Sequence, residues 1–210
     1  MAINEAVCPV CERLAIDGAT HPRCKTRYAI DGLTSFFRYD GIIRKAVKAL
    51  KYRFVSDLAS EFVSLIPLSS FNEVSKLLTS QRIILVPIPL HQSRLRERGY
   101  NQAEVLGTLI AGKLGIPIQA DILKRTRKTT PQVEMKKRED RLKNMEKVFS
   151  INNVTTRLQT PERSNGGQVK EYDKVILFDD VFTTGATMRS AANVLKRNGA
   201  KFVWGMTMAR

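Results

Sequence analysis

The chain has 210 residues, enough for one good hydrophobic core and a small appendage. Its hydrophobic and charged fractions, 43% and 26%, are typical of a globular protein, and no apolar run reaches the roughly 18 residues of a membrane-spanning helix. The 35 Lys and Arg residues against 20 Asp and Glu give a formal charge of +15. That excess favours a polyanionic partner, either a sugar phosphate or a nucleic acid, although a merely solvated basic surface is the alternative.

Residues 1–7 lack the basic and apolar regions of a signal peptide, so we expect a cytoplasmic location and no membrane span. All three cysteines follow soon after. Cys8 and Cys11 form a CxxC pair, and His21 and Cys24 form an HxxC pair. Two ligands from each of two tight turns predict a closed, structural zinc site. A disulfide would leave one cysteine over, and a redox CxxC would not need the second pair.

We therefore expect residues 1–30 to form a small zinc-ribbon-like module, folded by its metal. Beyond it, residues 33–39 predict a strand, and residues 42–50 a helix with an apolar stripe opposite Lys and Arg. A second helix is expected over about 57–66, and a helix and loop over 69–80. The apolar residues 83–90 predict a buried strand that stops at prolines, and Asn101 is expected to cap a helix over 103–114.

Arg94, Arg96 and Arg98 lie between that strand and that helix. We expect them to form a dense positive loop at the carboxyl end of the strand, where ligands of α/β sheets bind. Arginine is well suited to bidentate contact with phosphate. The alternative is an ordinary solvated basic turn.

The segment 123–149 is strongly basic and has few large apolar residues. It predicts a mobile arm that acts as a lid over a polyanion or as a nucleic-acid surface, a solvated helix being the alternative. The candidate contact residues in this arm are Arg125, Lys136, Lys137, Arg138 and Arg141. The polar stretch at about 155–172, with Pro161, Gly166 and Gly167, predicts a variable loop.

The most informative stretch runs from Val175 to Thr187. Four apolar residues predict a buried parallel strand, which ends at Asp179 and Asp180. The residues that follow open a helix whose N-terminus favours an anion, and the glycine lets the backbone close around a phosphate. This expected phosphate loop consists of Thr183, Thr184, Gly185, Ala186 and Thr187. Carboxylates beside such a loop suit sugar hydroxyls and a hydrated Mg²⁺, so we expect a phosphorylated sugar as ligand.

The expected helix ends at Gly199, and residues 202–208 predict another strand, which completes a βαβ unit. The stretch Val175–Thr187 resembles the phosphoribosyl-pyrophosphate (PRPP) signature of type I phosphoribosyltransferases. This resemblance implies an α/β fold with a mostly parallel sheet flanked by helices. It assigns Asp179 and Asp180 to the ribose hydroxyls, as candidate catalytic residues, and Thr183–Thr187 to the 5′-phosphate. Thr183 stands where purine-salvage relatives have an acid/base Asp, so purine salvage is not expected.

Three motifs together resemble a narrower group, the competence protein F (ComF)-type phosphoribosyltransferases: the Cys/His pairs, residues Val86–Gln102 and residues Asp179–Gly185. The resemblance implies that a zinc ribbon precedes a phosphoribosyltransferase domain over 31–210. It implies that Arg94, Arg96 and Arg98 bind the pyrophosphate leaving group with Mg²⁺, and that the protein serves DNA uptake. His21 stands where this group more often has Cys, and the insert near 155–172 is longer than usual.

Three functions follow as hypotheses. The first is Mg²⁺-dependent transfer of a phosphoribosyl group from PRPP to an unknown acceptor. The second is a single-stranded DNA-binding competence factor, working with DNA-uptake proteins, in which PRPP is a regulatory ligand or a relic. The third is a PRPP-sensing regulator without turnover, which needs the same phosphate loop as the enzyme.

Overall fold

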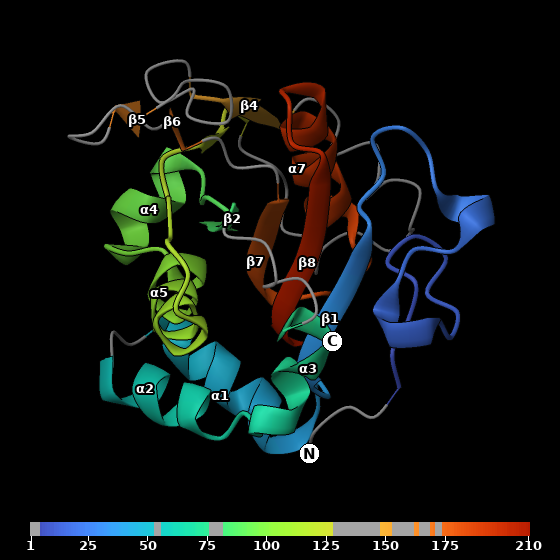
Figure 1. The fold of residues 1–210 in the computed structure, drawn as a ribbon. Helices are drawn as coiled ribbons and strands as arrows, with labels where there is room; N and C mark the ends of the chain where they lie inside the picture. Colours follow the sequence, from blue (N-terminus) through green and yellow to red (C-terminus); the bar gives the residue numbers. More distant parts are fainter. Residues whose placement is uncertain are drawn as a thin grey trace.

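A four-stranded parallel sheet in the order β1-β8-β7-β2 forms the centre of the protein (Figure 1). The computed structural model describes residues 5–52, 56–75, 82–127, 148–152, 162–163, 169–170 and 174–210. The four strands are β1 (Gly32–Phe37), β2 (Ile83–Pro87), β7 (Lys174–Val181) and β8 (Phe202–Ala209). In register, Val86 of β2 lies opposite Leu177 of β7, which lies opposite Gly205 of β8. The α/β class with a parallel sheet is confirmed, while the type I phosphoribosyltransferase fold itself stays a prediction.

Helices cover both faces of this sheet. Successive side chains of a strand point to opposite faces, and in β7 the side chains on both faces are apolar and must be buried. Val175 and Leu177 enter one core, which also contains Met188 and Leu195 of α7 (Ala186–Arg197). Ile176 and Phe178 enter the other core. That second core is covered by α1 (Gly41–Tyr52), α2 (Ser56–Ser64), α3 (Asn72–Ser75) and α5 (Gln102–Leu114). The predicted near-continuous apolar strands are therefore buried on both faces, as parallel strands usually are.

The predicted helix signals are found at the expected ends. The Asn101 side chain accepts a hydrogen bond of 3.2 Å from the N–H of Ala103 at the start of α5, and Gly115 ends that helix in a left-handed conformation. The apolar stripe of α7 is buried, with Met188 at 2% exposure and Ala191, Ala192 and Leu195 at 0%. The Asn101 cap thus fixes the start of α5, and the buried apolar stripe fixes α7 against the sheet.

Two segments contain more regular structure than we predicted. The arginine-rich stretch after β2 is a short helix, α4 (Gln92–Arg98), which His91 caps by accepting from the N–H of Ser93. The ends of the basic arm are held in an antiparallel pair, β3 (Leu123–Arg125) with β4 (Phe149–Ile151). Within the expected variable loop, β5 (Glu162–Arg163) pairs with β6 (Val169–Lys170). Arg94, Arg96 and Arg98 thus lie on a helix, and the expectation that they form a loop was wrong.

The N-terminal segment runs beside β1 and contains two single-turn helices, η1 (Ile16–Gly18) and η2 (Pro22–Cys24) (Figure 1). Val7 packs into the same core as α7, together with Ile30 and Leu33. A further turn, η3 (Leu68–Phe71), precedes α3. Among the residues described, no helix is both long and apolar enough to cross a bilayer.

Candidate functional site: an acidic pair, a phosphate loop and a Cys/His cluster

The two adjacent carboxylates lie near the carboxyl end of β7, as the sequence predicts. Asp179 is paired in register with Thr207 of β8, and the N–H of Asp180 donates a 2.9 Å hydrogen bond to Oδ1 of Asp179. Both side chains are only partly buried, so they remain accessible at the edge of the sheet. This is the edge at which ligands of parallel α/β sheets bind.

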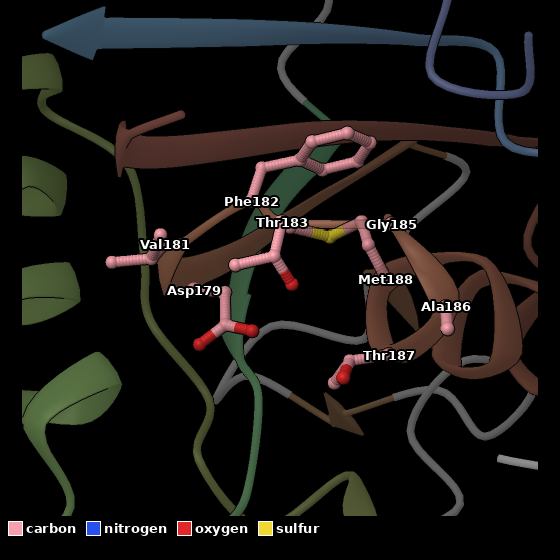
Figure 2. A pocket seen from close by; sticks show the side chains of 8 residues that line it. All are labelled: Asp179, Val181, Phe182, Thr183, Gly185, Ala186, Thr187 and Met188. Atoms are coloured by element: carbon pink, nitrogen blue, oxygen red, sulfur yellow. The ribbon is translucent and has the colours of Figure 1, made fainter. Parts of the chain in front are cut away.

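A hollow lies beside these carboxylates, at the N-terminus of α7 (Figure 2). It is lined by Asp179, by residues 181–183 and by residues 185–188, and its empty space, open in part to solvent, is about 260 Å³. Figure 2 shows the carboxylate of Asp179 and the hydroxyls of Thr183 and Thr187 around this space. A helix N-terminus in such a hollow attracts an anion, because its first N–H groups have no partners within the helix.

Gly185 is required at the start of α7 for two reasons. Its φ of 67° lies in the left-handed region, and a Cβ there would come within 2.4 Å of the Phe182 ring and 2.6 Å of Nη1 of Arg189. Nearby, Oγ1 of Thr184 is buried and has no hydrogen-bond partner among the described residues. Buried hydroxyls normally have a partner, so this oxygen is a candidate contact for a ligand or a water.

Lys51, which the sequence reasoning missed, belongs to this site. Its Nζ lies 3.0 Å from Oδ2 of Asp180, and the two side chains are only 28% and 15% exposed. Burial acts to lower the pKa of Lys51, but the attraction of Asp180 and then Asp179 outweighs it and raises the pKa. The ammonium group is therefore charged, and it is shielded from water far better than an ordinary surface ion pair.

Asp179 has a strongly perturbed pKa. Burial is the largest cause, and the negative charge of Asp180 adds to it; together they outweigh the N–H of Asp180 and the charge of Lys51, and raise the pKa of Asp179 to about 8. Two adjacent carboxylates cannot easily ionise together in a shielded site. A cation or hydroxyl-bearing ligand would relieve this repulsion, so perturbation of this kind marks a candidate functional site.

One arginine side chain, that of Arg125, lies within electrostatic reach of Asp179. Desolvation lowers the pKa of Arg125, the charge of Arg94 lowers it further, and Asp179 acts in the opposite direction. Arg125 also lies over the Phe149 ring, with 5.6 Å from its Cζ to the ring centroid. Arg125 is thus within electrostatic reach of both Arg94 and Asp179.

The three arginines of α4 are not equivalent. Arg94 and Arg98 are partly buried, whereas Arg96 is exposed. Arg98 donates to Oε1 of Gln102, and Nδ2 of Asn101 donates a 3.0 Å hydrogen bond to the carbonyl of Ile88. The structure therefore places Arg94 within electrostatic reach of Arg125, while Arg98 bonds to the first residue of α5.

The residues after α4 also fix the helix that carries Lys51. The hydroxyl of Tyr100 donates to the carbonyl of Leu50, next to Lys51 at the end of α1. The helix is held from its other side by its apolar stripe, in which Val47 is 1% exposed and Leu50 is 5% exposed. A residue of the arginine-rich motif thus supports the placement of a cation at the acidic pair. Lys136, Lys137, Arg138 and Arg141 lie outside the described residues.

A second cluster forms where the sequence predicts a metal site. The ligand atoms of Cys8, Cys11, His21 and Cys24 all lie within 4.8 Å of one another. Nδ1 of His21 lies 3.3 Å from Sγ of Cys11, and its Nε2 lies 2.9 Å from the carbonyl of Leu14. A histidine that gives one ring nitrogen to a carbonyl and turns the other toward thiols has the usual arrangement of a metal ligand. This cluster can hold a metal such as zinc.

The thiols of this cluster are also perturbed. Burial acts to raise the pKa of Cys8, but hydrogen bonds from the backbone of Cys11, His21 and Val10 outweigh it and lower the pKa. Desolvation and the neighbouring thiols of Cys11 and Cys8 raise the pKa of Cys24 to about 11. Three thiols so close together cannot all ionise without a cation, and a divalent metal supplies that charge.

Comparisons with known proteins identify relatives of this chain. No protein-family model matches it. It is 32% identical over 127 residues to "Competence protein F" of Haemophilus influenzae, which covers 60% of this chain and 50% of that protein. It is 29% identical over 216 aligned residues to "Competence protein ComFC" of Bacillus subtilis, covering 99% of this chain and 79% of that protein. Against "DNA utilization protein YhgH" of Escherichia coli K12, it is 31% identical over 119 residues, 57% of this chain and 45% of that protein.

The match to the Haemophilus protein thus spans half of that protein's length, whereas the match to the Bacillus protein runs through almost the whole of this chain. The latter includes the Cys/His cluster as well as the acidic pair and the loop after it. With these relatives and this N-terminal cluster, the chain belongs to the ComF family of competence proteins.

Proposed function

We propose that this protein binds PRPP at the carboxyl edge of β7 and β2 and transfers its phosphoribosyl group to an acceptor. The observation that carries the proposal is that carboxylates and positively charged groups lie together at the carboxyl edge of the sheet. The acidic pair lies beside an anion-binding helix N-terminus, Lys51 contacts Asp180, Arg125 is within electrostatic reach of Asp179, and Arg94 is within reach of Arg125. A ligand with neighbouring hydroxyls and phosphates at both ends satisfies all of these groups.

Each group has a role in this proposal. The loop Thr183–Thr187 holds the 5′-phosphate at the N-terminus of α7, and the Thr184 hydroxyl gains the partner that it lacks. Asp179 and Asp180 accept hydrogen bonds from the ribose hydroxyls. Lys51 and Arg94 neutralise the pyrophosphate, helped by Arg125. The carboxylates also suit Mg²⁺ held through water, which would stabilise charge on the leaving group.

The reaction we propose is a substitution at carbon 1 of the ribose. The bond from carbon 1 to the pyrophosphate oxygen breaks, pyrophosphate leaves with the electron pair, and an acceptor nucleophile forms the new bond. The chain's contribution is to orient the sugar and to place positive charge where the leaving group gains negative charge. The acceptor is not one that needs an Asp at the position of Thr183.

A second function is favoured by the relatives and the charge. Proteins named for competence and for DNA utilization match this chain, which carries a formal charge of +15. We propose that the protein takes part in DNA uptake in the cytoplasm, with DNA-uptake proteins as partners, and that it contacts single-stranded DNA through its basic arm. In this alternative, PRPP is a regulatory ligand rather than a substrate.

Calorimetric titration of PRPP, with and without Mg²⁺, tests the first proposal. Asp180→Asn should lose binding, while Asp40→Asn, whose side chain is 65% exposed and lies 3.8 Å from Arg38 in a surface pair, should bind as the wild type does. Equal affinity in all three proteins would reject the site. Binding without consumption of PRPP in the presence of single-stranded DNA or other acceptors would favour the regulatory alternative.

A further inference from the structure

The helix that carries the phosphate loop is tied to the Cys/His cluster. Nη1 of Arg189, one turn into α7, donates a 2.8 Å hydrogen bond to the carbonyl of Pro9. Pro9 lies between the cluster residues Cys8 and Cys11. The backbone N–H of Arg189 donates a 2.8 Å bond to the carbonyl of Gly185, the residue that opens α7. One residue therefore bonds to both the phosphate loop and the turn between two candidate metal ligands.

The guanidinium of Arg189 also runs close to the loop itself. Its Nη1 is 2.6 Å from the point where a Cβ on Gly185 would lie. Around it, Val7 and Val10 of the N-terminal segment pack in the same apolar core as Phe182 and Ala186. The floor of the phosphate loop and the edge of the cluster are thus one continuous packed unit.

The far end of α7 is fixed to the following part of the N-terminal segment. Nζ of Lys196 lies 2.7 Å from Oδ2 of Asp31, and both side chains are at most 7% exposed. Cζ of Arg197 lies 4.4 Å from the centre of the Tyr28 ring. These contacts hold the helix in place independently of the bond at Pro9. The Arg189–Pro9 bond, by contrast, joins the loop end of α7 to the cluster.

We propose that Arg189 is a positioning residue that couples metal at Cys8, Cys11, His21 and Cys24 to anion binding at Thr183–Thr187. A metal bound by Cys8 and Cys11 fixes the Pro9 carbonyl between them, and that carbonyl fixes the guanidinium under the phosphate loop. The loop is then held in the shape that an anion needs. This inference rests on the proposed PRPP site, and linkage makes it reciprocal: PRPP must also strengthen metal binding.

The test compares the wild type with Arg189→Met, Arg189→Lys and the matched control Arg197→Met, all loaded with zinc. Zinc affinity is measured by equilibrium competition with a colorimetric chelator, with and without saturating PRPP. PRPP should raise zinc affinity by about tenfold in the wild type and in Arg197→Met, have no effect in Arg189→Met, and regain part of its effect in Arg189→Lys. Arg189→Met should also bind PRPP about tenfold more weakly at equal zinc content.

A second measurement separates this inference from the proposed function. Amide hydrogen exchange of residues 183–189 is recorded without ligand, in zinc-loaded and chelated protein. Chelation should speed exchange at this loop more than at residues 195–199 in the wild type, but not in Arg189→Met, where exchange is already fast. If PRPP does not bind, the proposed function fails and this exchange pattern still decides the coupling. Equal exchange at the loop with and without zinc would overturn the inference, as would equal zinc affinity with and without bound PRPP.

Discussion

Nζ of Lys51, at the end of α1, lies 3.0 Å from Oδ2 of Asp180, near the end of β7. This pair joins the helices on one face of the sheet to the residues that precede the phosphate loop. It also gives the acidic pair a built-in counter-ion at the place where the proposed ligand brings phosphates. The pair is mostly shielded from water, so the attraction between its charges is screened less than in a surface salt bridge.

Replacing Lys51 by Met should weaken PRPP binding by about tenfold, because a charge-assisted contact to phosphate is lost. The loss also leaves Asp180 without its cation, so the remaining affinity should depend more strongly on Mg²⁺. Lys48→Met is the matched control, since Lys48 is exposed on the same helix. Titration calorimetry of both variants checks this, and equal affinities for Lys51→Met and Lys48→Met would show that Lys51 does not contact the ligand.

Asp179 should make the ligand-free protein less stable as the pH rises. Its pKa is raised from 3.8 to about 8 by burial and by Asp180, so the fold favours the neutral carboxyl. The stabilisation is fully present below about pH 4 and is lost as the pH rises toward 8. In the Asp179→Asn variant the side chain is neutral at every pH, so its stability should not fall in this way as the pH rises.

Urea unfolding at pH 5 and pH 8 measures this difference. The free energy of unfolding should fall between these values by at least about 1 kcal/mol more in the wild type than in Asp179→Asn, because each pKa unit corresponds to about 1.4 kcal/mol. Other titrating groups are common to both proteins and cancel in the comparison. Identical pH profiles would mean that Asp179 ionises normally.

Gly185→Ala should damage both stability and ligand binding. The new Cβ would meet the Phe182 ring and Arg189, in a backbone conformation that alanine rarely adopts. We expect a loss of roughly 1–3 kcal/mol and no measurable PRPP binding. Gly99→Ala separates the two causes, because Gly99 has a φ of 80° but open space around it. That variant should lose stability only, and thermal unfolding beside calorimetry shows whether it does.

The Cys/His cluster should bind one zinc ion per chain, as measured by native mass spectrometry and elemental analysis. His21→Ala should lower zinc affinity by more than about tenfold, because it removes a proposed ligand. His91→Ala is a natural control, since His91 caps α4 and takes no part in the cluster. Zinc affinity unaffected by His21→Ala would leave three cysteines as the whole site.

Binding of single-stranded DNA should be strongly salt-dependent. Neutralising Lys136, Lys137 and Arg138 together should reduce the slope of log affinity against log salt by about 2, since each phosphate contact contributes roughly 0.7. A matched triple replacement of Arg44, Lys45 and Lys48, all exposed on α1, serves as the comparison. If the α1 replacement has the larger effect in fluorescence titrations, the basic arm is not the main DNA contact.

The main sheet and its flanking helices could be predicted because their patterns are local. The apolar runs that became β2, β7 and β8 are continuous, and α5 and α7 carry both an apolar stripe and end signals such as Asn101 and Gly199. The acidic pair and the phosphate loop follow directly from one such run. The Cys/His pairs were equally local, and the structure brings their four side chains together.

What the sequence could not show depends on contacts between distant segments. Lys51 reads as one of several cations on the polar side of α1, and only the fold places it beside Asp180. Helix α4 has no apolar stripe, so periodicity could not find it, although His91 and Gly99 are suitable caps. The β3–β4 pair brings together Arg125 and Phe149 from opposite ends of the basic arm. Likewise, the bond from Arg189 to Pro9 joins the two ends of the chain.

The most direct test of the proposed site is a crystal structure of the protein with PRPP and Mg²⁺. We predict the 5′-phosphate at the N-terminus of α7, bound by Thr183–Thr187, with the ribose hydroxyls on Asp179 and Asp180 and the pyrophosphate near Lys51 and Arg94. PRPP bound elsewhere, or absent at saturating concentration from a well-folded, zinc-loaded protein, would contradict this account.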